Sequence, residues 1–134
     1  MLKGKCINPL IISALSHCGH GDKLLIADGN YPIDTMTADA ETVYLSLSPG
    51  LPEVTQVLDA VLSVINAEKA EVMHPDEGPE PEIFSEFQSM TGLELCELSR
   101  YEFYGACKES NVRLAILTGE QRTYANILLT VGCA

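Results

Sequence analysis

The spacing of hydrophobic residues changes several times along the chain, and each change predicts a new element of secondary structure. After Asn8 and Pro9, apolar residues recur at helical spacing as far as Cys18. An asparagine followed by a proline is a typical helix start, so this segment is predicted to be a helix. The apolar run 24–27 is too short for an ordinary helix and is bounded by Gly-Asp and Asp-Gly, which predicts a buried strand.

The rest of the chain continues this interleaving of strands and helices. Apolar stripes predict helices that begin near Pro52, Ile83 and Ser99, and Ser99 forms a capping box with Glu102. Further strands are predicted over residues 43–47, 70–73, 93–98, 112–117 and 127–131. Interleaved elements indicate an α/β fold with helices on the faces of a largely parallel sheet. At 134 residues, the chain is expected to form a single domain, residues 1–134.

The chain carries a large excess of negative charge. Eight Lys and Arg residues against nineteen Asp and Glu residues give a formal charge of −11, and the basic residues form no cluster. Such a surface repels nucleic acid and anionic membranes, so neither is expected as a partner. The same field disfavours a strongly anionic substrate and favours a neutral ligand.

The cysteines and the N-terminal segment indicate a cellular compartment. The five cysteines are odd in number and widely spaced, without a Cys-x-x-Cys pair. The apolar segment 10–15 is short and interrupted by Ser13, so we expect neither a secretion signal nor a membrane span. These features predict a cytoplasmic protein with reduced thiols.

Polar residues gather at both ends of the predicted strand 24–27. His20 and Asp22 precede the strand, and Asp28 follows it. Gly19 is expected to end the first helix in a left-handed conformation and so to hold His20 in a rigid corner. Ligands of open α/β sheets bind beyond the carboxyl ends of the strands, which places Asp28 at a binding site. We expect His20 to lie at the same opening as Asp28.

Three separated blocks of sequence carry a resemblance to a known family. They are Gly19-His20-Gly21-Asp22, then Asp28-Gly29-Asn30-Tyr31-Pro32, and near the C-terminus Thr118-Gly119-Glu120 with Tyr124-Ala125-Asn126-Ile127-Leu128-Leu129. In this order they resemble the bacterial family of fucose mutarotases and ribose pyranases, over nearly the whole chain. The resemblance implies a three-layer α/β/α fold with a mixed sheet, no cofactor, and ring-shaped homo-oligomers such as a decamer.

The resemblance also implies an activity and roles for individual residues. Members interconvert the forms of a free monosaccharide, a reaction in which one proton leaves the anomeric hydroxyl and another reaches the ring oxygen. Histidine holds both protonation states near neutral pH and can carry such protons. The implied catalytic residues are His20 and Asp22, where Asp22 either orients the imidazole or serves as a structural acceptor. The implied sugar-binding residues are Asp28, Arg100, Tyr124, Ala125 and Asn126.

The segment around Arg100 bears on which sugar is used. Ser99-Arg100-Tyr101-Glu102-Phe103-Tyr104 resembles the fucose mutarotase version, in which an arginine contacts the sugar. The expected activity is therefore an isomerase acting on a fucose-like monosaccharide, with D-ribose pyranase as the alternative. Asn30 and Asp34 depart from the residues of relatives, which leaves the particular sugar open.

Other interpretations of the same residues stay open. A non-catalytic sugar-binding protein would keep the same pocket. A metal-dependent hydrolase would use a set drawn from His17, His20, Asp22, Asp28 and His74, but their spacing matches no standard metal motif, so no metal is expected. A cysteine nucleophile is a weaker alternative, because helical periodicity turns Cys18 towards the core.

Overall fold

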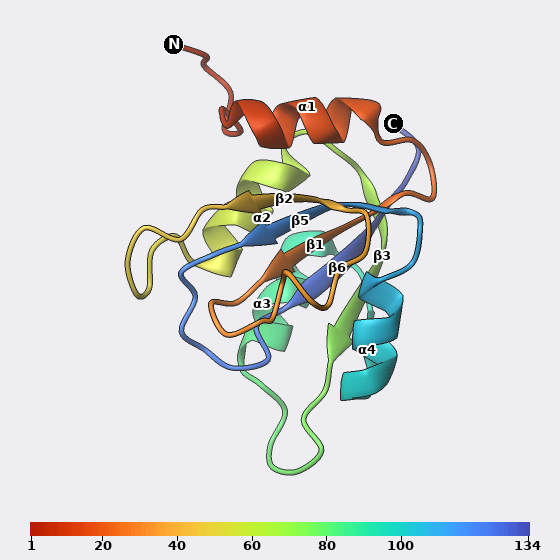
Figure 1. The fold of residues 1–134 in the computed structure, drawn as a ribbon. Helices are drawn as coiled ribbons and strands as arrows, with labels where there is room; N and C mark the ends of the chain where they lie inside the picture. Colours follow the sequence, from red (N-terminus) through yellow and green to blue (C-terminus); the bar gives the residue numbers. More distant parts are fainter.

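A computed structural model describes residues 1–134 and contains four helices and six strands (Figure 1). In chain order they are α1 (Pro9–His17), β1 (Lys23–Ala27), β2 (Glu41–Tyr44), α2 (Val54–Leu62), β3 (Ala67–Met73), α3 (Ile83–Thr91), β4 (Leu95–Leu98), α4 (Arg100–Cys107), β5 (Val112–Leu117) and β6 (Ile127–Val131).

All six strands form one mixed sheet in the order β2-β5-β1-β6-β3-β4. The pairs β2–β5, β5–β1 and β3–β4 are parallel, whereas β6 is antiparallel to both of its neighbours, β1 and β3. Because β6 runs against β1, the start of β6 lies at the carboxyl end of β1. This juxtaposition brings residues about a hundred positions apart to one edge of the sheet.

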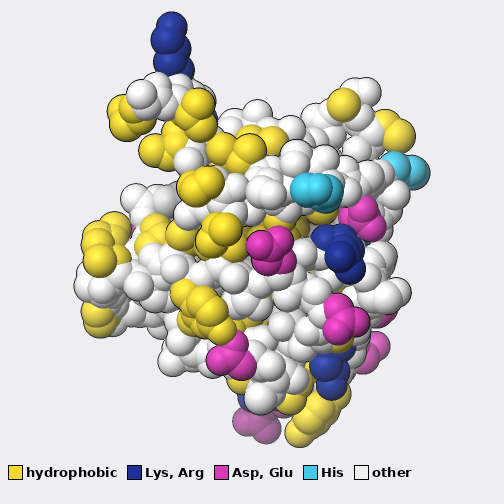
Figure 2. Space-filling view, turned by 45° about the horizontal axis from the view of Figure 1, so that its top comes forward, with side chains coloured by type: hydrophobic (Ala, Val, Ile, Leu, Met, Phe, Trp, Pro, Cys, Tyr) yellow, Lys and Arg dark blue, Asp and Glu magenta, His cyan; other side chains and the backbone are white.

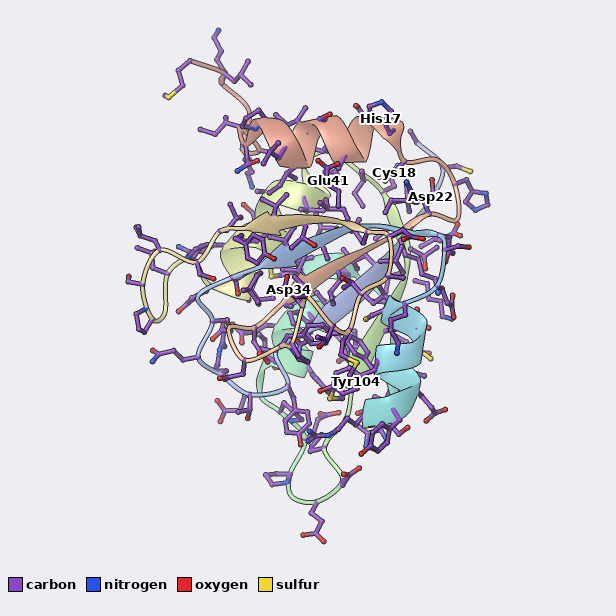
Figure 3. The ribbon with its side chains drawn as sticks, in the orientation of Figure 1. His17, Cys18, Asp22, Asp34, Glu41 and Tyr104 are labelled. Atoms are coloured by element: carbon purple, nitrogen blue, oxygen red, sulfur yellow. The ribbon has the colours of Figure 1, made fainter.

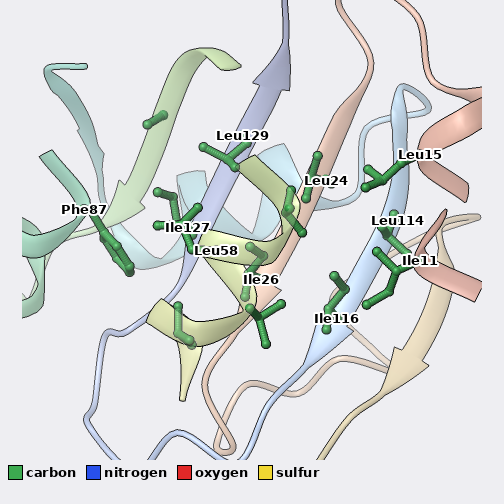
Figure 4. Packing of buried hydrophobic residues seen from close by; sticks show 14 of the residues in the cluster. Ile11, Leu15, Leu24, Ile26, Leu58, Phe87, Leu114, Ile116, Ile127 and Leu129 are labelled. Carbon is green, nitrogen blue, oxygen red and sulfur yellow. The ribbon is translucent and has the colours of Figure 1, made fainter. Parts of the chain in front are cut away.

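Helices cover both faces of the sheet. One face packs against α1, α2 and α3, in a core that includes Leu15, Leu58, Phe87 and the strand residues Ile26 and Leu129 (Figure 4). The other face packs against α4 and the loop after β1, in a smaller core that includes Tyr31 and Phe103. The three-layer α/β/α arrangement with a mixed sheet, expected from the sequence, is confirmed.

Local sequence explains where the helices begin and end. The side chain of Asn8 accepts hydrogen bonds from the N–H groups of Leu10 and Ile11, and Ser99 and Glu102 form the expected capping box. Gly92 ends α3 with φ 69°, a left-handed conformation that glycine adopts without steric cost.

Two local predictions are corrected by the structure. The left-handed glycine between α1 and β1 is Gly21, with φ 90°, and not Gly19, because α1 ends at His17 in extended backbone at Cys18. The second strand occupies Glu41–Tyr44, earlier than the predicted 43–47, since its pairing with β5 extends over Leu114–Leu117. None of the helices combines the length and the apolar character that crossing a bilayer would require.

Candidate functional site

A small polar cavity lies at the end of the sheet where strands β1 and β3 end and strand β6 begins. Its volume is about 190 Å³, and ten residues line it: Asp28, Asn30, Tyr31, Pro32, Met73, Arg100, Tyr104, Thr123, Tyr124 and Asn126. The cavity is smaller than the pockets that hold drug-sized ligands, which indicates a small ligand. It contains four of the five residues that the sequence predicts for sugar binding.

Asp28 and Asn126 form the floor of this cavity through two reciprocal hydrogen bonds. The backbone N–H of Asp28 donates to Asn126 Oδ1 at 2.8 Å, and Asn126 Nδ2 donates to Asp28 Oδ2 at 3.0 Å. The other carboxylate oxygen, Oδ1, accepts from the N–H of Asn30 at 2.9 Å. Burial raises the pKa of the Asp28 carboxyl despite these hydrogen bonds, which favour its charged form. A buried carboxylate held in this way suits a hydrogen bond to a sugar hydroxyl.

Arg100 and Tyr124 form the mouth of the cavity. Arg100 Nη2 donates to Tyr124 Oη at 3.1 Å, and the guanidinium carbon lies 6.0 Å from the centre of the Tyr124 ring. Tyr124 has φ 60°, a conformation that non-glycine residues seldom adopt and that is frequent at functional sites. Tyr104 lies one helical turn beyond Arg100 and so shares its face of α4. This spacing is the signal by which Tyr104 could have been found from sequence.

The loop that carries Tyr124 is held by a buried carboxylate. Glu120, with a side chain only 4 % exposed, accepts from Nε and Nη2 of Arg122 at 3.0 and 2.9 Å. It also accepts from the N–H of Val54 at the start of α2, while Arg122 Nη1 donates to Glu86 of α3 at 2.7 Å. The loop is thus tied to two helices, α2 and α3, on the face of the sheet opposite α4.

Ala125 contributes differently from its neighbours. Its side chain is fully buried in the larger core, so only its backbone faces the carboxyl group of Asp28. Met73 and Thr123 line the cavity but were not predicted, because neither residue type carries a recognisable signal of ligand binding.

His20 does not lie in this cavity, and the expectation that it shares the opening of Asp28 is wrong within one chain. His20 precedes β1 and Asp28 follows it, and the five residues of β1 span roughly 17 Å. In Figure 3, Asp22 lies at the start of β1 near α1, whereas Tyr104 of the cavity lies on α4, well away from it. His20 instead borders a separate groove of about 540 Å³ between α1, the α2–β3 loop and the C-terminus.

The imidazole of His20 has Glu68, not Asp22, as its partner. His20 Nε2 lies 2.9 Å from both carboxylate oxygens of Glu68 on β3. Asp22 Oδ2 accepts the backbone N–H of Gly19 at 2.8 Å, which is the structural role that the sequence left open for it. Glu68 was not predicted, since it is 48 positions away from His20 and lies in no recognised motif.

The residues that a metal-dependent hydrolase would use lie far apart in the structure. His17 and His20 lie at the N-terminal side of β1, whereas Asp28 and His74 lie beyond the carboxyl ends of β1 and β3. No group of three or more His, Cys, Asp or Glu side chains is placed to hold a metal ion. Cys18 packs against the larger core, and burial raises the pKa of its thiol.

Comparison with protein families settles the relationship of the chain. The model of the RbsD / FucU transport protein family matches residues 1–134. The chain belongs to this family. A D-ribose pyranase of Clostridium novyi is 34 % identical over 134 residues, with 98 % of each chain covered. A D-ribose pyranase of Clostridium perfringens is 32 % identical over 133 residues, again with 98 % of each chain covered.

Solved structures of RbsD / FucU proteins share the fold. The fucose mutarotase of Streptococcus pneumoniae, in complex with L-fucose, superposes with a TM-score of 0.81 at 26 % identity, covering 96 % of this chain and 94 % of the other. RbsD of Bacillus subtilis, complexed with D-ribose, superposes with a TM-score of 0.80 at 27 % identity, covering 100 % and 99 %. The named relatives are thus sugar pyranases and mutarotases, and they do not single out fucose.

Proposed function

We propose that this protein is a cofactor-independent isomerase that interconverts the forms of a free monosaccharide, with D-ribose and L-fucose as the two sugars to test. The convergence of Asp28, Asn126, Arg100 and Tyr124 on one cavity of about 190 Å³ carries this proposal. Carboxylate, amide, guanidinium and phenol groups together donate to and accept from the hydroxyls of a neutral sugar. The formal charge of −11 agrees with a neutral substrate.

The relatives favour D-ribose over L-fucose as the first substrate. The curated relatives at 34 and 32 % identity are named D-ribose pyranases. Arg100 favours the fucose-like alternative, because its segment resembles the mutarotase version and it lies at the cavity mouth. Both sugars therefore belong in the same assay.

His20 supplies the proton transfer in this proposal, and it does so in the cavity of another copy of the chain. Within one chain, β1 separates His20 from Asp28, but the imidazole is 59 % exposed and open to a neighbour. The groove beside His20 offers that neighbour an apolar surface. A ring-shaped homo-oligomer, in which each copy gives His20 to one site and Asp28 to another, satisfies this geometry.

Exposed apolar side chains support such assembly. Met1, Leu2, Ile7, Leu10, Tyr44 and Leu47 are all 47 % exposed or more. In Figure 2, hydrophobic side chains are most numerous on the left of the view, with one histidine side chain near the upper centre and another at the upper right. Large apolar side chains that gather on an exposed face are typical of protein–protein contacts.

Exchange NMR on D-ribose and L-fucose tests the proposal. The protein is expected to accelerate interconversion of the sugar's forms. His20→Gln is expected to lower the rate by a factor on the order of 10²–10⁴ while the fold is retained. His17→Gln is the matched control, since His17 is also exposed and contacts only the carbonyl of Ser13. Binding without acceleration would support the non-catalytic alternative, and full activity of His20→Gln would remove this imidazole from the mechanism.

A further inference from the structure

The pairing of His20 with Glu68 uses one ring nitrogen and leaves the other free. Nε2 lies 2.9 Å from both Oε1 and Oε2 of Glu68, whereas Nδ1 has no hydrogen-bond partner in the chain. A carboxylate only accepts hydrogen bonds, so this contact requires a proton on Nε2. In the neutral imidazole, Nδ1 then carries the lone pair.

A β-bulge presents Glu68 to His20. On β3, Ala67 pairs with Val131 and Lys69 pairs with the preceding residue, Thr130, so Glu68 is the extra residue between two paired positions. Bulges bend a strand and redirect a side chain, and they are frequent next to active sites. The side chain of Glu68 therefore departs from the regular alternation of β3.

Gly132 leaves the space that Glu68 occupies. A Cβ atom at position 132 would lie 3.2 Å from the Cβ and 3.5 Å from Oε2 of Glu68. The N–H of Gly132 donates to the carbonyl of Asn66 at 2.7 Å, which fixes this close approach of the two strands. An added Cβ at position 132 would therefore press on the Cβ of Glu68, while its contact with the carboxylate would be of ordinary length.

Hydrogen bonds also hold the backbone next to His20. The N–H of Gly21 donates to the carbonyl of Val131 at 2.9 Å, and Asn111 Nδ2 donates to the carbonyl of Gly21 at 3.0 Å. Asp22 closes the turn through the N–H of Gly19. The segments that carry the imidazole and the carboxylate are thus both held by the end of β6, at Val131 and Gly132.

We propose that Glu68 is a positioning residue that keeps Nε2 of His20 protonated and makes Nδ1 the nitrogen that exchanges protons with the sugar. This inference rests on the proposed function. In ring opening, the Nδ1 lone pair takes the proton of the anomeric hydroxyl as the C1–O bond to the ring oxygen breaks and a carbonyl forms. A water molecule protonates the released ring oxygen, and the resulting hydroxide recovers the proton from Nδ1. Closure on the other carbonyl face reverses these transfers.

The first test measures the tautomer directly, without substrate. Two-bond ¹H–¹⁵N correlation spectra of the ¹⁵N-labelled protein, recorded in alkaline buffer so that the imidazole is neutral, are expected to show the proton on Nε2 of His20. Glu68→Leu removes the acceptor and is expected to give a mixture of tautomers, whereas Glu68→Gln still accepts through its amide oxygen and is expected to shift the balance less. An unchanged Nε2–H tautomer in Glu68→Leu would overturn the positioning role.

The second test measures turnover with the sugar that the wild-type protein accepts. Glu68→Leu is expected to lower kcat roughly 10-fold with little change in KM, since the sugar-binding groups lie elsewhere, and Glu68→Gln is expected to fall between it and the wild type. Glu94→Gln is the control, because Glu94 is exposed and makes no hydrogen bond or ion pair. Wild-type kcat in Glu68→Leu would overturn the inference while leaving the proposed function intact. Absence of turnover in the wild type itself would overturn the proposed function, whatever the tautomer.

Discussion

Asn126 and Asp28 clamp the ends of two antiparallel strands to each other through two hydrogen bonds in opposite directions, at 2.8 and 3.0 Å. Both residues are buried, with 4 % and 3 % of their surface exposed. The amide accepts from the backbone N–H through its oxygen and donates to the carboxylate through its nitrogen at the same time. The clamp therefore sets both the strand ends and the direction of the carboxylate.

Replacement of Asn126 is expected to weaken stability and sugar binding together. Asn126→Ala leaves the buried N–H of Asp28 without an acceptor, at a cost of about 1–3 kcal/mol in the free energy of unfolding. Urea denaturation and a sugar titration measure the two effects. Asn66→Ala, which removes an exposed hydrogen bond to the carbonyl of Cys133, is the control and is expected to change neither strongly. A variant Asn126→Ala with wild-type stability would contradict the clamp.

The pairing of Arg122 with Glu120 is expected to make the free energy of unfolding depend on pH. Burial of Glu120 opposes its charge, but hydrogen bonds from Arg122 and the charge of its guanidinium together lower the pKa of this carboxyl. A lowered pKa stabilises the folded chain above the unfolded carboxyl value of roughly 4.3, and this contribution is lost as the pH falls through the folded pKa. Arg122→Gln is expected to cost about 1–2 kcal/mol at pH 7, a figure reduced by the partial exposure of Arg122.

Urea denaturation over a pH series checks this prediction. The difference between wild type and Arg122→Gln is expected to be largest above about pH 5 and to narrow at lower pH. Lys5→Gln breaks the Lys5–Asp59 ion pair, in which both side chains are more than half exposed, and serves as the control with little expected change. A difference that stays constant from pH 7 to pH 3 would show that Glu120 does not carry the effect.

Arg100 is expected to affect sugar binding without affecting stability. Its side chain is exposed and contacts Tyr124 at the cavity mouth. Arg100→Lys keeps the positive charge but loses the forked donor, so KM is expected to rise roughly 10-fold with an unchanged unfolding transition. The ratio of activities on L-fucose and D-ribose is the sharper measurement: if Arg100 selects the fucose-like sugar, that ratio falls in the variant. An unaltered KM for both sugars would remove Arg100 from the binding site.

The five cysteines are expected to separate into distinct reactivity classes. Burial raises the pKa of Cys107 to about 12, and that of Cys6 is also raised by burial, so neither forms appreciable thiolate at neutral pH. Cys96 and Cys133 are exposed and are expected to react rapidly with a thiol reagent, with Cys18 slower. Mass spectrometry after timed alkylation, with a urea-unfolded sample as the fully reactive reference, checks this order. Rapid modification of Cys107 in the folded protein would contradict its burial.

The parts of the fold that depend on local signals could be predicted from sequence. The starts of α1 and α4 could be predicted because their capping residues act on backbone groups within one helical turn. These residues are Asn8 and Pro9 for α1, and Ser99 and Glu102 for α4. Asp28 was placed at a binding site by the strand that precedes it, but Asn126 was recognised only through a family resemblance, because strand pairing over 98 positions joins the two residues. Glu68 was missed for a related reason: its direction depends on a bulge, and a bulge is a property of the pairing between β3 and β6.

The position of His20 could not be predicted, and it has a consequence for the whole molecule. One short strand, β1, separates His20 from the cavity that contains Asp28, so under the proposed function each chain gives its histidine and its cavity to different active sites. In the assembly that we propose, mixing His20→Gln and Asp28→Asn subunits brings an intact histidine from one parent to an intact cavity from the other. Two inactive proteins are expected to restore turnover when they are unfolded and refolded together.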